Sequence, residues 1–133
     1  MSTFESKVTI QKPISEVYDF LADMNNHQQL MPDSVTDWVS TYDTIKFTIQ
    51  NMAKLSLAVE SRVQNSEIKI IPSEKPPFNL ELKWILSSKN EHTEVLFTIY
   101  ADLNMMLKMM ASGPLQKLAD HETNALVSML SKT

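Results

Sequence analysis

An alternation of apolar and polar residues marks the first element of the chain. Between residues 3 and 10 one side of an extended strand would be entirely polar, and the inward side would carry Phe4, Ser6, Val8 and Ile10. This period of two predicts a half-buried β-strand. Pro13 suits the start of a helix, and apolar residues then recur at helical spacing, at Ile14, Val17, Tyr18 and Leu21. We expect this helix to end near Asp23, and any short helix that follows to stop at Pro32.

The period changes to two again from Val35 onward, which predicts a run of strands joined by short turns. Trp38 belongs to the first of these strands. The later strands have apolar stripes on one side: Ile45, Phe47 and Ile49; Leu55, Leu57 and Val59; Ile68 and Ile70; and Phe78, Leu80, Leu82, Trp84 and Leu86. The inward face of the last strand, residues 94 to 101, is ambiguous because both of its sides carry large apolar residues.

The turns between these strands must form almost without glycine, since Gly113 is the only one in the chain. Asparagine and aspartate tolerate left-handed backbone geometry best among the other residues. They predict turns at Tyr42-Asp43, Asn51, Asn65-Ser66 and Lys89-Asn90.

The segment from about Asn104 to Ser131 has a helical composition and would form a rod of roughly 40 Å. Its apolar residues fall on one broad stripe, in which Glu122 is the single charged residue; the stripe consists of Leu107, Met110, Ala111, Leu115, Leu118, Ala125, Leu126 and Met129. Only packing along a sheet would hold such a rod. The patterns therefore predict one α+β domain over residues 1–133.

Composition narrows the possible functions. The absence of cysteine excludes disulfides, thiolate nucleophiles and cysteine-bound metals. The net charge is −4, and only Arg62 among the 12 scattered basic residues is an arginine, so nucleic acid is a poor candidate partner. A single glycine excludes the glycine-rich loops that bind nucleotides, and we expect no cofactor. The first residues lack an apolar signal core and no long apolar run follows, so we expect a cytoplasmic protein without an integral membrane segment.

Metal and catalytic motifs are incomplete. The stretch HETNA at 121 to 125 begins like a zinc-protease helix, but Ala125 stands where the second histidine ligand would have to be. His27, His92 and His121 are far apart in the sequence, and we expect each of them at the surface. No serine lies in a nucleophile-elbow motif.

Three stretches carry a resemblance to a known superfamily: KPISEVYDFLAD, Met31-Pro32 and LQKLADHETNALVSML. In the first, the positions that match the opening "Pro-x-x-x-Val-aromatic…Asp" pattern are Pro13, Val17, Tyr18, Leu21 and Asp23. With the order of elements, these stretches resemble the helix-grip fold of the START-like, or SRPBCC, superfamily over nearly the whole chain. The resemblance implies a curved antiparallel sheet of six or seven strands wrapped around the C-terminal helix, with two short helices after the first strand and an apolar pocket between sheet and helix.

The superfamily includes lipid carriers, polyketide cyclases and aromatases, quinone-binding proteins and chaperone activators, so the resemblance leaves three functions open. The first is non-catalytic binding of a small hydrophobic or amphipathic molecule, such as a lipid, quinone or polyketide-like compound. The second is a cyclase, aromatase or dehydratase with Glu122 or a serine as proton carrier. The third is a protein-interaction module. A monomer and a homodimer fit the sequence equally.

For ligand binding, apolar and aromatic side chains on the inward stripes would form the walls of the pocket. The expected ligand-binding residues are Trp38, Phe47, Ile49, Leu57, Val59, Trp84, Phe97, Ile99, Met106, Met110 and Glu122. The alternative is that these side chains simply fill the core.

Polar residues at inward positions need partners, which a ligand, neighbouring groups or buried water could supply. They are Ser6, Ser61, Glu122 and the indole N–H of Trp84. Burial should raise the pKa of Glu122. Four methionines, at 105, 106, 109 and 110, precede Gly113-Pro114, where we expect a kink or break. They would suit a gate, or else fill gaps in the core.

Overall fold

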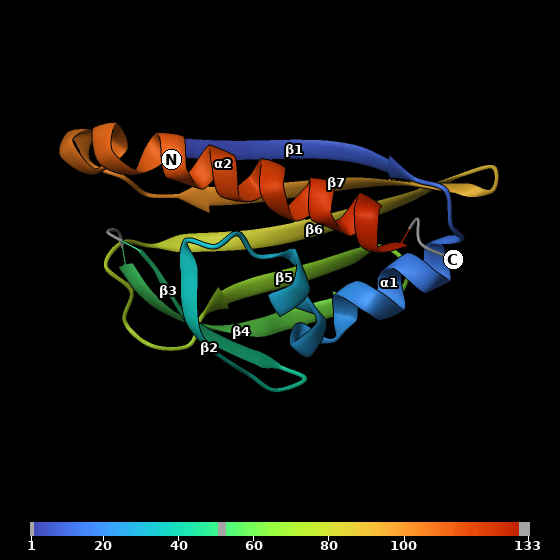
Figure 1. Ribbon diagram of the computed structural model, residues 1–133, viewed down its shortest axis with the longest axis horizontal. Coiled ribbons are helices and arrows are strands. Elements are labelled where there is room, and N and C mark those ends of the chain that lie inside the picture. The colour runs from blue at the N-terminus through green and yellow to red at the C-terminus, as the bar shows by residue number, and fades with distance from the viewer. Residues whose placement is uncertain (1, 51–52, 131–133) are drawn as a thin grey trace.

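A seven-stranded antiparallel sheet curves around one long helix in the computed structural model, which describes residues 2–50 and 53–130 (Figure 1). The elements, in chain order, are β1 (Ser2–Ile10), α1 (Ile14–Ala22), the 3₁₀ helix η1 (Met24–Leu30), β2 (Val35–Ser40), β3 (Thr44–Ile49), β4 (Ala53–Val63), β5 (Glu67–Pro72), β6 (Leu80–Lys89), β7 (His92–Ala101) and α2 (Met105–Leu130).

The strands lie in the order β1-β7-β6-β5-β4-β3-β2, so that β1 joins the far end of a meander formed by the other six. This arrangement confirms the helix-grip α+β fold, and the second of the two short helices is the 3₁₀ helix η1. Asn65 and Asn90 both have a φ of 58°, as expected for left-handed turn residues. The turn predicted at Asn51 lies outside the described residues.

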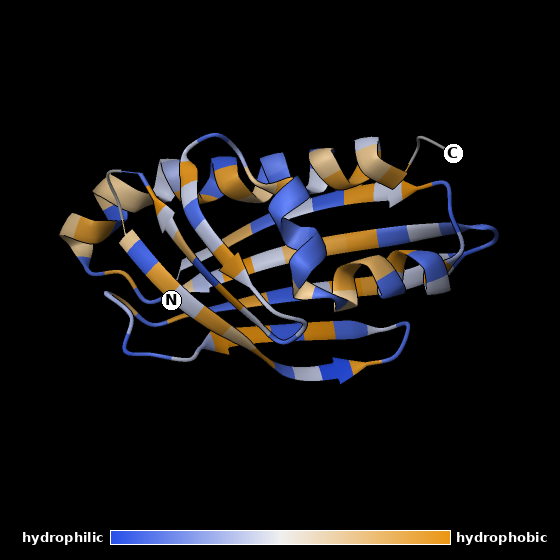
Figure 2. Cartoon of the chain, turned by 60° about the horizontal axis from the view of Figure 1, so that its bottom comes forward, coloured by the Kyte–Doolittle hydropathy of each residue, from blue (hydrophilic) through white to orange (hydrophobic). Residues whose placement is uncertain are grey.

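Hydrophobic and hydrophilic residues alternate along the strands (Figure 2), and the residues of the apolar stripes are mostly buried. The ambiguity of β7 is resolved, because Val95, Phe97 and Ile99 are all fully buried. The prediction for Ser61 is wrong: this residue is exposed. The register of β4 against β5 shifts between Val59 and Ser61, so that Ser61 pairs with Lys69 on the outer face and the inward position passes to Arg62, opposite Ile68. Val59, just before the shift, is half-buried.

The long helix α2 packs on β1 and β7 and also meets η1. Its buried side chains are Ala111, Leu115, Leu118, Ala119, Glu122, Thr123 and Leu126. Of the kink or break expected at Pro114, the break does not occur, because the helix runs continuously from Met105 to Leu130. Ala111 and Leu115 are buried on either side of the proline, and their packing holds the helix together although Pro114 donates no hydrogen bond.

The methionines at the start of α2 do not fill gaps in the core. Met105, Met106, Met109 and Met110 are 83%, 72%, 84% and 63% exposed. The first fully buried side chain of the helix is Ala111, so its first two turns project beyond the packed part of the sheet. Within the described ranges, no helix has the length and apolar character that a membrane span requires.

Candidate functional site

A small cavity lies between the concave face of the sheet and α2. Its volume is about 20 Å³, which is enough for about one water molecule. Apolar side chains from β3, β4, β5, β6 and β7 form most of its wall, and α2 and η1 close it. Six of the residues expected to bind a ligand line this cavity: Phe47, Ile49, Leu57, Trp84, Ile99 and Glu122.

The other five expected residues lie outside the cavity wall. Trp38 stacks on Phe47 with ring centroids 5.6 Å apart, and Phe97 stacks on Trp84 at 4.1 Å, so each supports a side chain that does line the cavity. Val59 pairs with the buried Ile70 just before the register shift in β4, and it is half-buried against the core rather than in the cavity wall. Met106 and Met110 belong to the exposed first turns of α2, which precede the part of the helix that faces the cavity.

Glu122 is the carboxyl group of the cavity wall. Its side chain is only 2% exposed, and it forms no hydrogen bond or ion pair with any described residue. Desolvation by burial raises its pKa to about 8, which confirms the direction expected from the helical stripe. At neutral pH this carboxyl group is therefore mostly protonated and able to donate a hydrogen bond.

His27 also lines the cavity, and the prediction that it lies at the surface is wrong, because it is 2% exposed. Its Nε2 donates to the carbonyl oxygen of Leu21 at 2.8 Å, so Nδ1 carries no proton in the neutral ring. Desolvation lowers its pKa to about 4, although the Leu21 carbonyl and Asp23 act in the opposite direction. The ring meets Trp84 edge-on, with centroids 5.8 Å apart.

The burial of His27 could have been predicted from a spacing of three residues, which a search for the α-helical period of 3.6 misses. Met24, His27 and Leu30 recur every three residues, and all three are buried. A 3₁₀ helix has three residues per turn, so these side chains share one face.

The remaining inward polar groups differ in how far the protein satisfies them. The hydroxyl groups of Ser6 and Thr123 are 2.6 Å apart, and Thr123 donates to the carbonyl oxygen of Asp120 at 3.1 Å, so Ser6 acts as the donor to Thr123. Neighbouring groups therefore satisfy Ser6. The Nε1 of Trp84, by contrast, is shielded from solvent and has no partner among the described residues.

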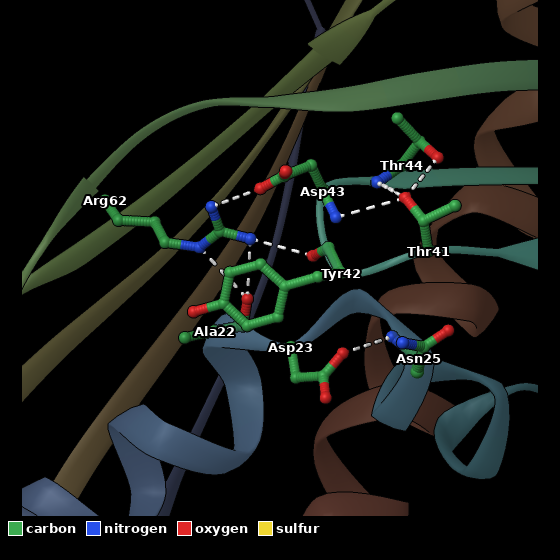
Figure 3. A network of polar contacts seen from close by, with 8 residues as sticks. All are labelled: Ala22, Asp23, Asn25, Thr41, Tyr42, Asp43, Thr44 and Arg62. Carbon is green, nitrogen blue, oxygen red and sulfur yellow. Dashed lines mark hydrogen bonds and ion pairs between the residues drawn. The ribbon is translucent and has the colours of Figure 1, made fainter.

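Arg62 holds the end of α1, directly before the 3₁₀ helix that carries His27; Figure 3 shows its contacts with Ala22, Tyr42 and Asp43. From β4 it donates to the carbonyl oxygen of Ala22 at the end of α1, through Nε at 3.0 Å and Nη2 at 2.8 Å. It also donates to the carbonyl oxygen of Tyr42 and to the carboxylate of Asp43, at 2.8 and 2.7 Å, and it lies over the Tyr42 ring. One side chain thus ties the junction of α1 and η1 to the β2–β3 turn.

Replacing Arg62 by lysine should destabilise the protein by about 2 kcal/mol, because an ammonium group cannot reach all of these acceptors and leaves carbonyl groups unpaired. Urea unfolding measures the change. Lys46→Ala is the control, since the exposed pair of Lys46 and Glu74 should contribute less than about 1 kcal/mol. Equal losses in the two variants would contradict this role for Arg62.

Two surface grooves lie along α2, and the first of them adjoins the cavity. The first, of about 410 Å³, shares Ile49 and Leu118 with the cavity wall and extends to Pro114 and His121. The second, of about 380 Å³, includes Met110 and shares Pro114 with the first. Ile49 and Leu118 are thus the side chains that line both the cavity and the first groove.

Comparison with solved structures identifies the fold. A START superfamily protein from Mycobacterium smegmatis is similar with a TM-score of 0.70 and 13% identity, over 98% of this chain and 97% of that chain. A solution structure of a KanY protein has a TM-score of 0.80 at 11% identity, over 98% and 97%. The protein TTHA0849 from Thermus thermophilus has a TM-score of 0.72 at 17% identity, over 98% and 95%.

No family model matches the sequence, and no curated protein matches it. At the identities of the solved structures, the likeness establishes the architecture and not the activity. The chain has the START-like, or SRPBCC, helix-grip fold.

Proposed function

We propose that this protein binds a small hydrophobic or amphipathic molecule, without changing it chemically, between the sheet and α2, and does so in the cytoplasm. Binding sites for such molecules are mostly apolar and contain a few polar groups that orient the ligand. The cavity has this composition: apolar side chains form most of its wall, and His27, Trp84 and Glu122 supply its hydrogen-bonding groups.

One observation carries the proposal: Glu122 is buried in this apolar wall without a partner among the described residues. An unsatisfied buried polar group costs about 1–3 kcal/mol, and a leucine at this position of the helix would avoid that cost. Groups of this kind concentrate at functional sites, where a ligand supplies the missing partner.

A ligand larger than one water molecule requires the cavity to open. Ile49 and Leu118 are 6% and 8% exposed and contribute to both the cavity and the 410 Å³ groove. We infer that movement of these two side chains would join the two spaces. We therefore place the entrance at Ile49 and Leu118.

Native mass spectrometry of the freshly purified protein, followed by organic extraction, tests the proposal. The expected result is a bound apolar molecule that is lost in Leu118→Trp, where the larger side chain obstructs the entrance. Asn124→Trp is the matched control on the same helix, at an exposed position that lines neither the cavity nor the grooves, and should retain the molecule. If the wild-type protein binds nothing after incubation with lipid, quinone and polyketide extracts, the proposal is wrong.

The start of α2 should open more readily than the rest of the helix and act as a gate. Pro114 leaves the carbonyl of Met110 without its helical donor, and the exposed methionines contribute little packing. Amide hydrogen exchange should be faster for residues 105–113 than for residues 115–130. Gly113→Ala should slow it, because nothing lies within 4 Å of an added Cβ and alanine favours a helix by about 1 kcal/mol.

If the two segments are equally protected, or if Gly113→Ala slows exchange without changing the rates of ligand association and release, no gate exists in this segment. The variant fits the backbone without a clash, so a failure to fold would not obscure the result.

A second candidate function, cyclase, aromatase or dehydratase chemistry, is favoured by the pKa of Glu122. A group with a pKa of about 8 can both give and take a proton near neutral pH, as a general acid or base must. Under this alternative, Glu122→Gln would retain substrate binding and abolish turnover, whereas a carrier would release its ligand chemically unchanged.

A further inference from the structure

Two groups on the cavity wall that can donate hydrogen bonds lack partners among the described residues. The unprotonated Nδ1 of His27 is a third unpartnered group on this wall, and it can only accept. Trp84, from β6, has an Nε1 that is shielded from solvent and bonds to none of them. Glu122, from α2, has a carboxyl group that forms no hydrogen bond or ion pair with them. Sheet and helix thus each contribute one unsatisfied group to the same cavity.

Both of these groups are donors at neutral pH. An indole N–H can only donate. Among the described residues no lysine or arginine lines the cavity, and the other titratable group on its wall, His27, is neutral. An isolated buried carboxylate without a cation is costly, so Glu122 keeps its proton and presents an O–H.

This inventory discriminates between classes of ligand. An anionic group, such as a phosphate or carboxylate, would find no cation on the described wall of the cavity. An ammonium group has no lone pair and would leave the Trp84 N–H unpaired. A carbonyl oxygen has two lone pairs and can accept one hydrogen bond from each donor.

We propose that the ligand is an uncharged, largely apolar molecule with a carbonyl oxygen, as in a ketone, quinone or ester, and that this oxygen accepts hydrogen bonds from Trp84 Nε1 and the protonated carboxyl group of Glu122. The inference rests on the proposed function, because it specifies the ligand of the same site.

The test uses four β-substituted naphthalenes of similar size: acetylnaphthalene, ethylnaphthalene, naphthoate and (aminomethyl)naphthalene. Dissociation constants come from calorimetry, and the indole ¹H–¹⁵N resonance of Trp84 reports a hydrogen bond at Nε1. Acetylnaphthalene should bind about tenfold more tightly than ethylnaphthalene, since two hydrogen bonds distinguish them. It should also bind more tightly than either charged probe and shift the Trp84 resonance downfield.

Variants assign the preference to the two donors. The preference for the carbonyl is the dissociation constant of ethylnaphthalene divided by that of acetylnaphthalene. Trp84→Phe and Glu122→Leu should each lower this ratio by about threefold or more, because each removes one donor. Glu122→Gln should preserve the ratio, since an amide still donates. Trp38→Phe is the matched control: the Nε1 of Trp38 is also shielded and unpartnered among the described residues, but Trp38 does not line the cavity.

Three outcomes would overturn the inference. Equal affinity for acetylnaphthalene and ethylnaphthalene would show that the site does not recognise a carbonyl oxygen, although it binds apolar molecules. Tighter binding of naphthoate or (aminomethyl)naphthalene would assign the site to a charged ligand. Failure of all four probes to bind or to shift Trp84 would reject both the inference and the proposed function.

Discussion

Glu122→Gln should stabilise the protein by about 3 kcal/mol at pH 7. The carboxyl group has a pKa of about 8 in the folded protein and of 4.5 as an unperturbed group, so the folded state holds its proton more tightly. This contribution to stability is fully present below pH 4.5 and is lost as the pH rises through 8, at about 1.4 kcal/mol per pH unit. Glutamine has nearly the same shape and does not ionise.

Urea unfolding at pH 5, 7, 7.5 and 8 measures this effect. The free energy of unfolding of the wild type should decrease steadily from pH 7 to pH 8, whereas that of Glu122→Gln should stay nearly constant in that interval. Glu91→Gln is the matched control at an exposed position and should follow the wild type. Parallel curves for wild type and Glu122→Gln would show that the carboxyl group is not buried in the folded protein.

His27 should destabilise the protein in acid by a comparable amount, about 3 kcal/mol between pH 6.5 and pH 4. Its pKa is lowered to about 4 by burial, from 6.5 for an unperturbed histidine, so the unfolded state binds the proton first as the pH falls. As the pH falls from 6.5 to 4.5, the stability lost through His27 and the stability gained through Glu122 nearly cancel. We expect a plateau of maximal stability over that range.

The Glu122→Gln background exposes the contribution of His27, because it removes the opposing group. In that background stability should fall from pH 6.5 to pH 4.5, and adding His27→Gln should abolish the fall, since the glutamine amide can still donate to the Leu21 carbonyl. His92→Gln, at an exposed position, is the control. If stability still falls toward pH 4.5 in the Glu122→Gln/His27→Gln variant, another group causes the fall. Glu94 cannot, because Lys7 and Lys89 lower its pKa to about 2 and its contribution changes only below pH 4.5.

The sequence by itself determined the elements and their inward faces. Local periodicity reports which side of a strand or helix is apolar, so the stripe on β6, the burial of Glu122 and the turns at Asn65 and Asn90 were all predictable. These features depend on backbone geometry over a few residues. The raised pKa of Glu122 follows from the same pattern, because desolvation is its cause.

Only the tertiary structure decided what each inward face meets. Burial of His27 depends on η1 having three residues per turn and on Arg62 holding the junction before it, and neither follows from a period of 3.6. The exposure of Ser61 depends on a register shift against β5, and the exposure of Met106 and Met110 on where α2 passes the edge of the sheet. The size of the cavity is likewise set by how side chains from seven elements pack together, and periodicity within one element contains no information about the volume left between them.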